Sequence, residues 1–152
     1  MTINTTFTSG QVLTASQMNN LPWGVAGRAI ITSDVNLTTS FVTMATLTFT
    51  AVANRYYRIT YFEPFCKTSS TIDSLINLKI AQGAASLQQS FINNPVVVQY
   101  FESMICTCVT TFSAGSTTIT AQALSTSTAG TPLLGRNGDR PAQFFIEDIG
   151  PV

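Results

Sequence analysis

From Val25 onward, apolar side chains alternate with Thr, Ser and other polar residues, and this two-residue period constrains the fold more than any other feature. Such alternation is typical of half-buried β-strands, and Gly, Pro, Asn and Asp mark the turns between the runs. No helical pattern follows residue 24. The chain is therefore predicted to be all-β, a jelly-roll-like β-sandwich preceded by an N-terminal arm with one short helix. The predicted strands are 25–31, 41–50, 56–62, 72–80, 87–92, 96–112, 117–124 and 143–149.

Three segments predict structural details beyond the positions of the strands. The apolar phase slips between Met44 and Leu47, which predicts a β-bulge. Residues 96–112 are too many for one typical strand, so we expect a break or bend near Ser103. Residues 125–139 are polar and rich in Gly and Pro, and they predict a long loop.

The first 24 residues differ in pattern from the rest of the chain and are predicted to form an anchoring arm. Residues 25–152 are predicted to form the β-domain. Thr14 and Gln17 have the spacing of a helix capping box, and Pro22 ends the short helix that would follow. A helix this short is marginal alone in water, so its apolar side chains must dock on this chain's own body or on a neighbouring subunit. The predicted anchoring residues are Val12, Leu13, Met18, Leu21 and Trp23.

Charge is scarce along the whole chain. Charged residues make up 9 % of the sequence and the formal net charge is +0, a pattern that suits a surface covered by partners. The Lys and Arg residues are scattered and form no basic stripe, so no nucleic-acid partner is predicted. The sequence has no stretch long enough for a transmembrane helix and no secretory signal. We therefore expect no membrane partner and synthesis in a cytosol.

The inventory of reactive residues predicts neither a cofactor nor a metal. There is no His, and the three cysteines, Cys66, Cys106 and Cys108, are neither a disulfide framework nor a complete zinc ligand set. Cys106 and Cys108 are two apart in a strand and would share one face. Small buried apolar residues are the expected role for all three.

An enzyme is not predicted either, because the commonest general base is absent. Glu147 and Asp148 are adjacent in a strand and should face opposite sides. Glu63, Glu102 and Asp73 look isolated in the sequence. No catalytic residues are assigned.

The segment GRNGDR, residues 135–140, is the one charge-rich loop. It is either a solvated turn with Asn-Gly at its tip or an exposed loop that contacts a partner or host. The candidate contact residues are Arg136, Asn137, Asp139 and Arg140.

Three segments in order resemble a known group of proteins. FTSGQVLTASQMNNLPWG at 7–24, ATLTFTAVANRYYRITYF at 45–62 and FFIEDIGP at 144–151 are similar to small virion structural proteins of tailed bacteriophages. Residues 67–141 are outside the resemblance. The resemblance implies a component of the phage particle, assembled in the host cytoplasm and built as a jelly-roll homotrimer.

Two functions are compatible with this resemblance. The first is a capsid decoration (cement) protein whose arm attaches to the major capsid protein of the head shell. The alternative is a tail appendage, tail-fibre or receptor-binding protein, anchored to tail proteins by the same arm, with loops near 125–140 facing a host surface glycan. The chain shows no repeats or coiled-coil shaft of the kind that a long fibre needs. A carbohydrate-binding or hydrolytic module is a third, unrelated possibility.

Overall fold

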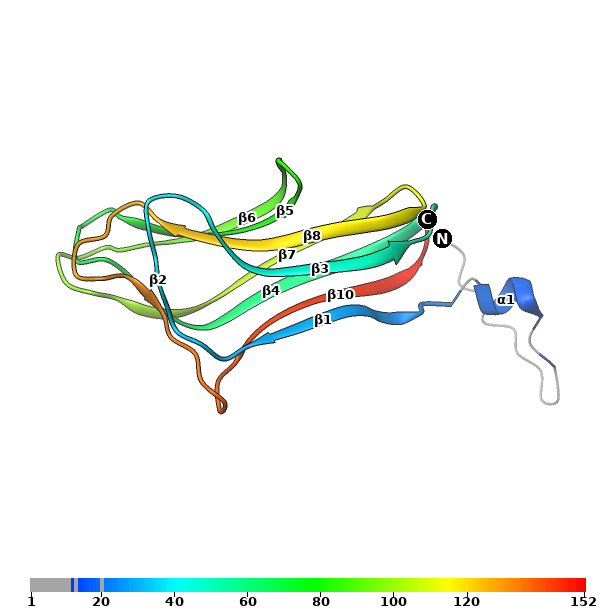
Figure 1. Cartoon of the computed structure of the whole chain (residues 1–152), viewed down its shortest axis with the longest axis horizontal. Coiled ribbons are helices and arrows are strands. Elements are labelled where there is room, and N and C mark those ends of the chain that lie inside the picture. Colours follow the sequence, from blue (N-terminus) through cyan, green and yellow to red (C-terminus); the bar gives the residue numbers. More distant parts are fainter. Residues whose placement is uncertain (1–11, 13, 20) are drawn as a thin grey trace.

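A computed structural model describes residues 12, 14–19 and 21–152, and the side chains of residues 16 and 17 are not part of the description. One short helix, α1, precedes the strands of the β-domain (Figure 1). The elements are α1 (Ala15–Asn19), β1 (Gly24–Ile31), β2 (Val35–Asn36), β3 (Val42–Ala51), β4 (Arg55–Lys67), β5 (Leu75–Gln82), β6 (Ala85–Asn93), β7 (Phe101–Thr111), β8 (Gly115–Ser125), β9 (Leu133–Leu134) and β10 (Ala142–Pro151).

The eight long strands form two antiparallel layers (Figure 1). In the first, called sheet A, the order is β1-β10-β4, with β7 on the other side of β4. The short strands β9 and β2 extend sheet A beyond the end of β10. In the second, called sheet B, the order is β3-β8-β5-β6. Strands that pair although they are far apart in sequence, such as β1 with β10 and β3 with β8, show the Greek-key topology of a jelly roll. The predicted fold class is confirmed.

The core lies between the layers because alternate residues of every long strand point inward. In β10, Phe144 and Ile146 are fully buried, whereas Phe145 and Glu147 lie on the outer side. Phe144 meets Tyr61 of β4 edge-on at 6.1 Å between ring centroids. At the end of the sandwich near α1, three rings close the core with centroid distances of 5.1–5.7 Å, those of Phe49, Tyr57 and Phe112.

The predicted β-bulge is confirmed, since the β3–β8 register shifts between Thr43 and Ala45. Residues 96–112 do not form one strand, and the expected irregularity near Ser103 is present as a shift in the β4–β7 register between Glu63–Met104 and Cys66–Glu102, without a break in β7. Strand β7 begins at Phe101, and residues 96–100 are irregular because Pro95 precedes them and Thr68 pairs with the backbone of Tyr100.

Several other strand boundaries differ from the prediction, among them the end of β4, which is at Lys67 rather than at residue 62. Strand β5 begins at Leu75 rather than Ile72, because Asp73 takes a positive φ of 59° in a tight turn. The end of β10 also differs, since Gly150 and Pro151 stay in the strand beyond a register shift at Asp148.

Candidate functional site: the N-terminal arm and its anchor

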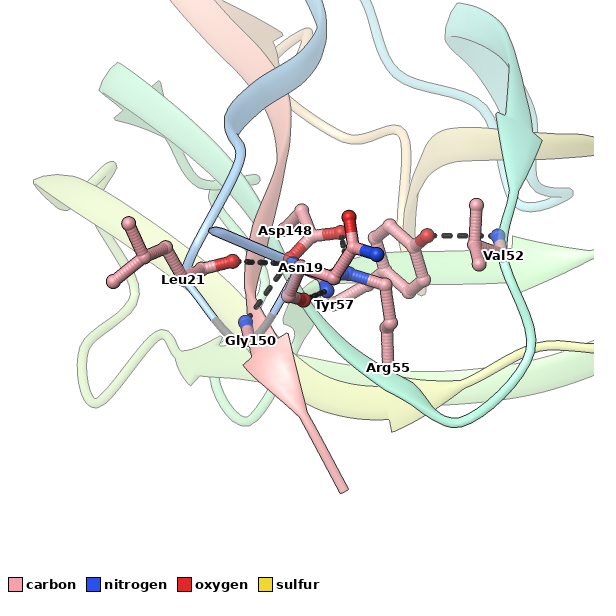
Figure 2. A network of polar contacts seen from close by, with 7 residues as sticks. All are labelled: Asn19, Leu21, Val52, Arg55, Tyr57, Asp148 and Gly150. Carbon is pink, nitrogen blue, oxygen red and sulfur yellow. Dashed lines mark hydrogen bonds and ion pairs between the residues drawn. The ribbon is translucent and has the colours of Figure 1, made fainter. Parts of the chain in front are cut away.

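A buried ion pair joins β4 to β10 at the end of the sandwich where the arm enters (Figure 2). Arg55 is the first residue of β4, and Asp148 is an inward-facing residue of β10. The Arg55 guanidinium donates to both carboxylate oxygens, with 2.5 Å from Nε to Oδ2 and 2.7 Å from Nη2 to Oδ1. Both residues are only 3 % exposed. This bidentate geometry is the strong form of an Arg–carboxylate contact.

The same guanidinium holds the backbone of the arm. Arg55 Nη1 donates to the carbonyl oxygen of Asn19 at 2.6 Å, and Nη2 donates to that of Leu21 at 2.6 Å. These are carbonyls at and after the end of α1, which lack intrahelical partners in any helix. The ring of Trp23 then lies 4.1 Å from Arg55 Cζ, a cation–π distance. Arg55 therefore fixes Asn19, Leu21 and Trp23 against the β-domain.

Asp148 binds the arm from the other side of the ion pair. Its carboxylate accepts from the backbone N–H of Gly150 at 3.0 Å and from that of Trp23. Burial alone would raise the pKa of Asp148. The hydrogen bond and charge of Arg55, together with the two backbone donors, outweigh burial and lower that pKa below its usual value. We call Arg55 and Asp148 the arm anchor.

The apolar side chains of the arm point away from the core. Val12 is 86 % exposed, Met18 55 %, Leu21 43 % and Trp23 55 %. The backbone N–H of Met18 donates to the Thr14 carbonyl at 3.0 Å, which closes the turn of α1. Of the predicted anchoring residues, Leu13 lies outside the described residues, as does the Gln17 side chain of the capping box. The four described residues are gathered at one end of the molecule without being packed into its core.

A hollow of about 280 Å³ adjoins the arm anchor. Its lining comes from the arm, from the β3–β4 turn and from the end of β10: Asn19, Trp23, Val52, Ala53, Asn54, Arg55 and Pro151.

Sequence reasoning missed the arm anchor, although one signal was available. In FFIEDI, Asp148 has the inward phase of Phe144 and Ile146, so the alternation alone places a carboxylate in the core. A buried carboxylate requires a cation and hydrogen-bond donors. The adjacent Glu147 faces outward as expected, where it accepts from Arg58 Nε at 2.8 Å.

The charge-rich loop at 135–140 is only partly exposed, and the expected exposure of Arg136 is wrong. Arg136 is 5 % exposed because its guanidinium binds Glu63 of β4, with 2.9 Å from Nε to Oε2 and 2.5 Å from Nη2 to Oε1. Its Nη1 also donates to the Ser33 carbonyl at 3.3 Å. Glu63 is therefore not isolated, since it accepts from Tyr61 Oη as well. Burial, and then Glu63, raise the pKa of Tyr61 well above its ordinary value.

The other three loop candidates are exposed. Asn137 Oδ1 accepts from the backbone N–H groups of Asp139 and Arg140 at 3.0 and 2.9 Å, which makes a tight turn. The Arg140 guanidinium lies 4.8 Å from the centre of the Phe65 ring. The loop thus exposes Asn137, Asp139 and Arg140 to solvent, while the ion pair of Arg136 with Glu63 attaches the base of the loop to sheet A.

The thiols carry no reactive site. Cys66, Cys106 and Cys108 are free, the first two are buried, and burial raises the pKa of Cys106 to about 11. No group of three His, Cys, Asp or Glu side chains that could hold a metal ion occurs among the described residues. Within the same part of the chain, no helix is long and apolar enough to cross a membrane.

No protein-family model matches the sequence, and no curated protein is similar to it. Among solved structures, a pentameric capsid protein from metagenomic phage sequences is similar over 81 % of this chain and 62 % of its own, with 16 % identity and a TM-score of 0.34. The Gt strain structure of infectious bursal disease virus is similar over 86 % of this chain and 38 % of its own, with 9 % identity and a TM-score of 0.41.

A carbohydrate-binding module of Cellvibrio mixtus lichenase 5A, solved with cellotriose, is similar over 82 % of this chain and 98 % of its own, with 15 % identity and a TM-score of 0.33. This chain thus spans less than two thirds of both viral structures. A phage capsid protein, a virus structure and a carbohydrate-binding module all appear among the structural neighbours. What identifies the fold is this chain's own strand order, β1-β10-β4-β7 over β3-β8-β5-β6.

Proposed function

We propose that this protein is a structural protein of the bacteriophage virion, a trimeric capsid decoration protein that attaches to the major capsid protein through its N-terminal arm. One observation carries the proposal: the arm backbone is fixed to the β-domain by Arg55 and Asp148, while its apolar side chains face outward. A preorganised segment of this kind binds a partner with less loss of conformational entropy than a free one. The similarity of residues 7–24 to virion proteins of tailed phages supports the same conclusion.

The attachment would depend on burial of apolar surface. Each Å² of apolar area removed from water contributes about 25 cal/mol, and burying a Leu or Met side chain contributes about 1.5–3 kcal/mol. Residues 12–23 of the arm carry no charged side chain, so electrostatic attraction adds little. Attachment should therefore survive high salt, since screening acts on charges rather than on buried apolar area.

The test is rebinding of the purified protein to particles from which it has been removed. Leu21→Ala and Met18→Ala should each weaken rebinding by roughly three- to tenfold, because about half of each side chain is exposed and available for burial. Leu21→Ala keeps the backbone carbonyl that Arg55 holds, whereas Trp23→Ala also removes the ring contact with Arg55. Ile72→Ala is the matched control, because Ile72 is 50 % exposed at the opposite end of the sandwich. Release by moderate salt, with Leu21→Ala rebinding normally, contradicts the proposal.

A tail appendage is the second candidate, and one surface favours it. Three loops at the end opposite α1, residues 68–74, 94–100 and 126–131, form a tip (Figure 1). They are joined by backbone hydrogen bonds such as Ser70 N–H to Ala129 O at 2.9 Å. Exposed apolar side chains project from the tip: Ile72, Val96, Val97, Val98 and Tyr100. With the arm at one end and an apolar tip at the other, the molecule could join a tail to a second surface.

The two candidates differ in what Ile72→Ala and Val97→Ser do. A receptor-binding tip predicts reduced host adsorption with normal particle assembly for these variants. A decoration protein predicts normal adsorption and normal particle binding for the same variants.

A further inference from the structure

The outward faces of the two sheets differ in chemistry. On sheet A, four aliphatic side chains are each more than half exposed: Val25 at 62 %, Ile30 at 55 %, Ile105 at 57 % and Val109 at 55 %. On sheet B, the outward positions of β3 and β8 are mostly hydroxyl-bearing: Thr43, Thr46, Thr48, Thr50, Ser116, Thr118 and Thr120. Exposed apolar residues that gather on one face indicate an interaction surface, whereas single ones do not.

The strand register places Ile30 and Ile105 in one row across sheet A and Val25 and Val109 in another, and the row between them consists of Arg28, Phe145, Thr60 and Thr107. Ile30 of β1 is opposite Gln143, which is opposite Phe62 of β4, which is opposite Ile105 of β7. A row of four outward side chains therefore crosses the whole sheet, with apolar residues at both edges and an aromatic ring between them. Directly opposite residues on antiparallel strands lie about 4.5–5.5 Å apart, so neighbours in this row touch.

A second row, closer to the arm, carries the charges of the face. It runs from Val25 through Glu147 and Arg58 to Val109. Arg58 and Glu147 neutralise each other at 2.8 Å. Arg28, in the row between the two, is bonded to the Gln143 side chain at 3.0 Å and is the remaining cation of the three rows. Val25 is two residues from Trp23 in the chain, so this end of the face is next to the arm.

This charge pattern fits a second copy of the same chain. Contacts between identical subunits bring copies of one charge set together, and on this face the Arg58–Glu147 pair leaves Arg28, bonded to the neutral Gln143 side chain, as the one charge without an opposite partner in these rows. A face that binds a charged partner would instead carry unpaired charges of the sign opposite to that of the partner. The face is also large enough to form an interface, since four strands about 4.8 Å apart and about eight residues long cover roughly 15 by 25 Å.

Stable interfaces bury about 800 Å² of accessible surface per partner. The flat area of this face is about half of that, and side-chain relief and the adjoining arm add to it. An interface of this size is at the small end, so association should depend on protein concentration in the micromolar range.

We propose that the outward face of sheet A is the contact between copies of this chain, and that the Thr-rich face of sheet B is left toward solvent. The inference rests on the proposed function in taking the protein to be an oligomer, and it adds which surface the subunits share. It can be tested without phage particles.

The test is the molar mass of the full chain by light scattering across a micromolar concentration series. Ile105→Glu combined with Val109→Glu places two charges four residues apart on the outward side of β7. Thr46→Glu combined with Thr50→Glu places the same charges at the same spacing on the outward side of β3 and is the matched control. Ile105→Thr combined with Val109→Thr removes the apolar surface while retaining β-branched side chains, which protects folding.

Wild type and the β3 control should associate, and both β7 variants should be monomeric with unchanged circular dichroism. Wild type that stays monomeric at tens of micromolar, or β7 variants that associate like wild type, overturns the inference. Neither result bears on attachment of the arm to the particle, because that is measured by rebinding. Conversely, an oligomer that fails to rebind would overturn the proposed function and leave this interface standing.

Discussion

Two buried ion pairs set the geometry of this molecule at the scale of single residues. Arg55 with Asp148 ties the arm to the end of the sandwich, and Arg136 with Glu63 ties the 135–140 loop to sheet A. In a chain with so few charges, four of the fourteen charged side chains are used in these two pairs. A buried pair is weak evidence for net stability, but removal of one partner leaves an uncompensated charge and is costly.

Asp148→Asn should loosen the arm and destabilise the protein by about 3–5 kcal/mol, because Arg55 is then buried without its counter-charge. Urea denaturation followed by fluorescence measures this directly, since Trp23 is the sole tryptophan and contacts Arg55. Asp139→Asn, at an exposed position, should leave the transition unchanged. A Trp23 signal and a urea midpoint equal to those of wild type would show that the anchor does not hold the arm.

The pH dependence of stability follows from the lowered pKa of Asp148. Its contribution is complete above the ordinary Asp pKa of about 3.9 and is lost as the pH falls through the lower folded value. Wild type should therefore lose stability in acid more steeply than Asp148→Asn. Denaturation midpoints measured from pH 6 down to about pH 2 test this, and parallel curves for the two proteins would contradict it.

Glu63→Gln should lower Tm, because it leaves the Arg136 guanidinium buried without a counter-charge. Glu63→Leu combined with Arg136→Met removes both charges and should recover much of the loss. Thermal unfolding by calorimetry measures both variants, with Glu147→Gln at the exposed pair as the control that leaves Tm unchanged. Additive losses in the double variant would mean that Glu63 and Arg136 act independently.

At the scale of elements, the arm and the tip are both shaped by hydrogen bonds between segments that are distant in sequence. The position of the arm depends on carbonyls of residues 19 and 21, and no side-chain pattern encodes these contacts. The tip depends on Asn94, which is fully buried and donates to the carbonyls of Ser69 and Thr71 at 2.8 and 3.1 Å. The alternation of apolar residues predicted most strands, whereas such contacts between loops leave no period in a sequence.

Asn94→Ala should destabilise the tip by about 1–3 kcal/mol, because the Ser69 carbonyl loses its Asn94 donor and the Thr71 carbonyl keeps only the donors of Ser74. Amide hydrogen exchange should show faster exchange in residues 68–74 and 94–100, with the strands unchanged. Asn93→Ala is the matched control, since Asn93 is the exposed neighbour. Uniformly faster exchange across the strands would mean that Asn94 supports the whole sandwich rather than the tip.

At the scale of the whole molecule, the sequence predicted the all-β class and the bulge in β3 because both follow from local periodicity. It did not place Arg136, because GRNGDR has the composition of a solvated turn, and only the fold brings Glu63 within reach. The alternation in β10 places Asp148 on the inward side, but it does not identify Arg55, 93 residues away, as its partner. Local patterns can indicate that a charged residue is buried, whereas its partner is known only from the fold.

The proposed function makes this chain a structural part of the phage head, attached by its arm. The decisive measurement is its copy number in purified virions, by quantitative mass spectrometry against the major capsid protein. A decoration protein predicts a copy number comparable to that of the capsid protein. A few copies per particle would contradict the decoration role and place the protein at the tail or a vertex, and its absence from virions would contradict the account as a whole.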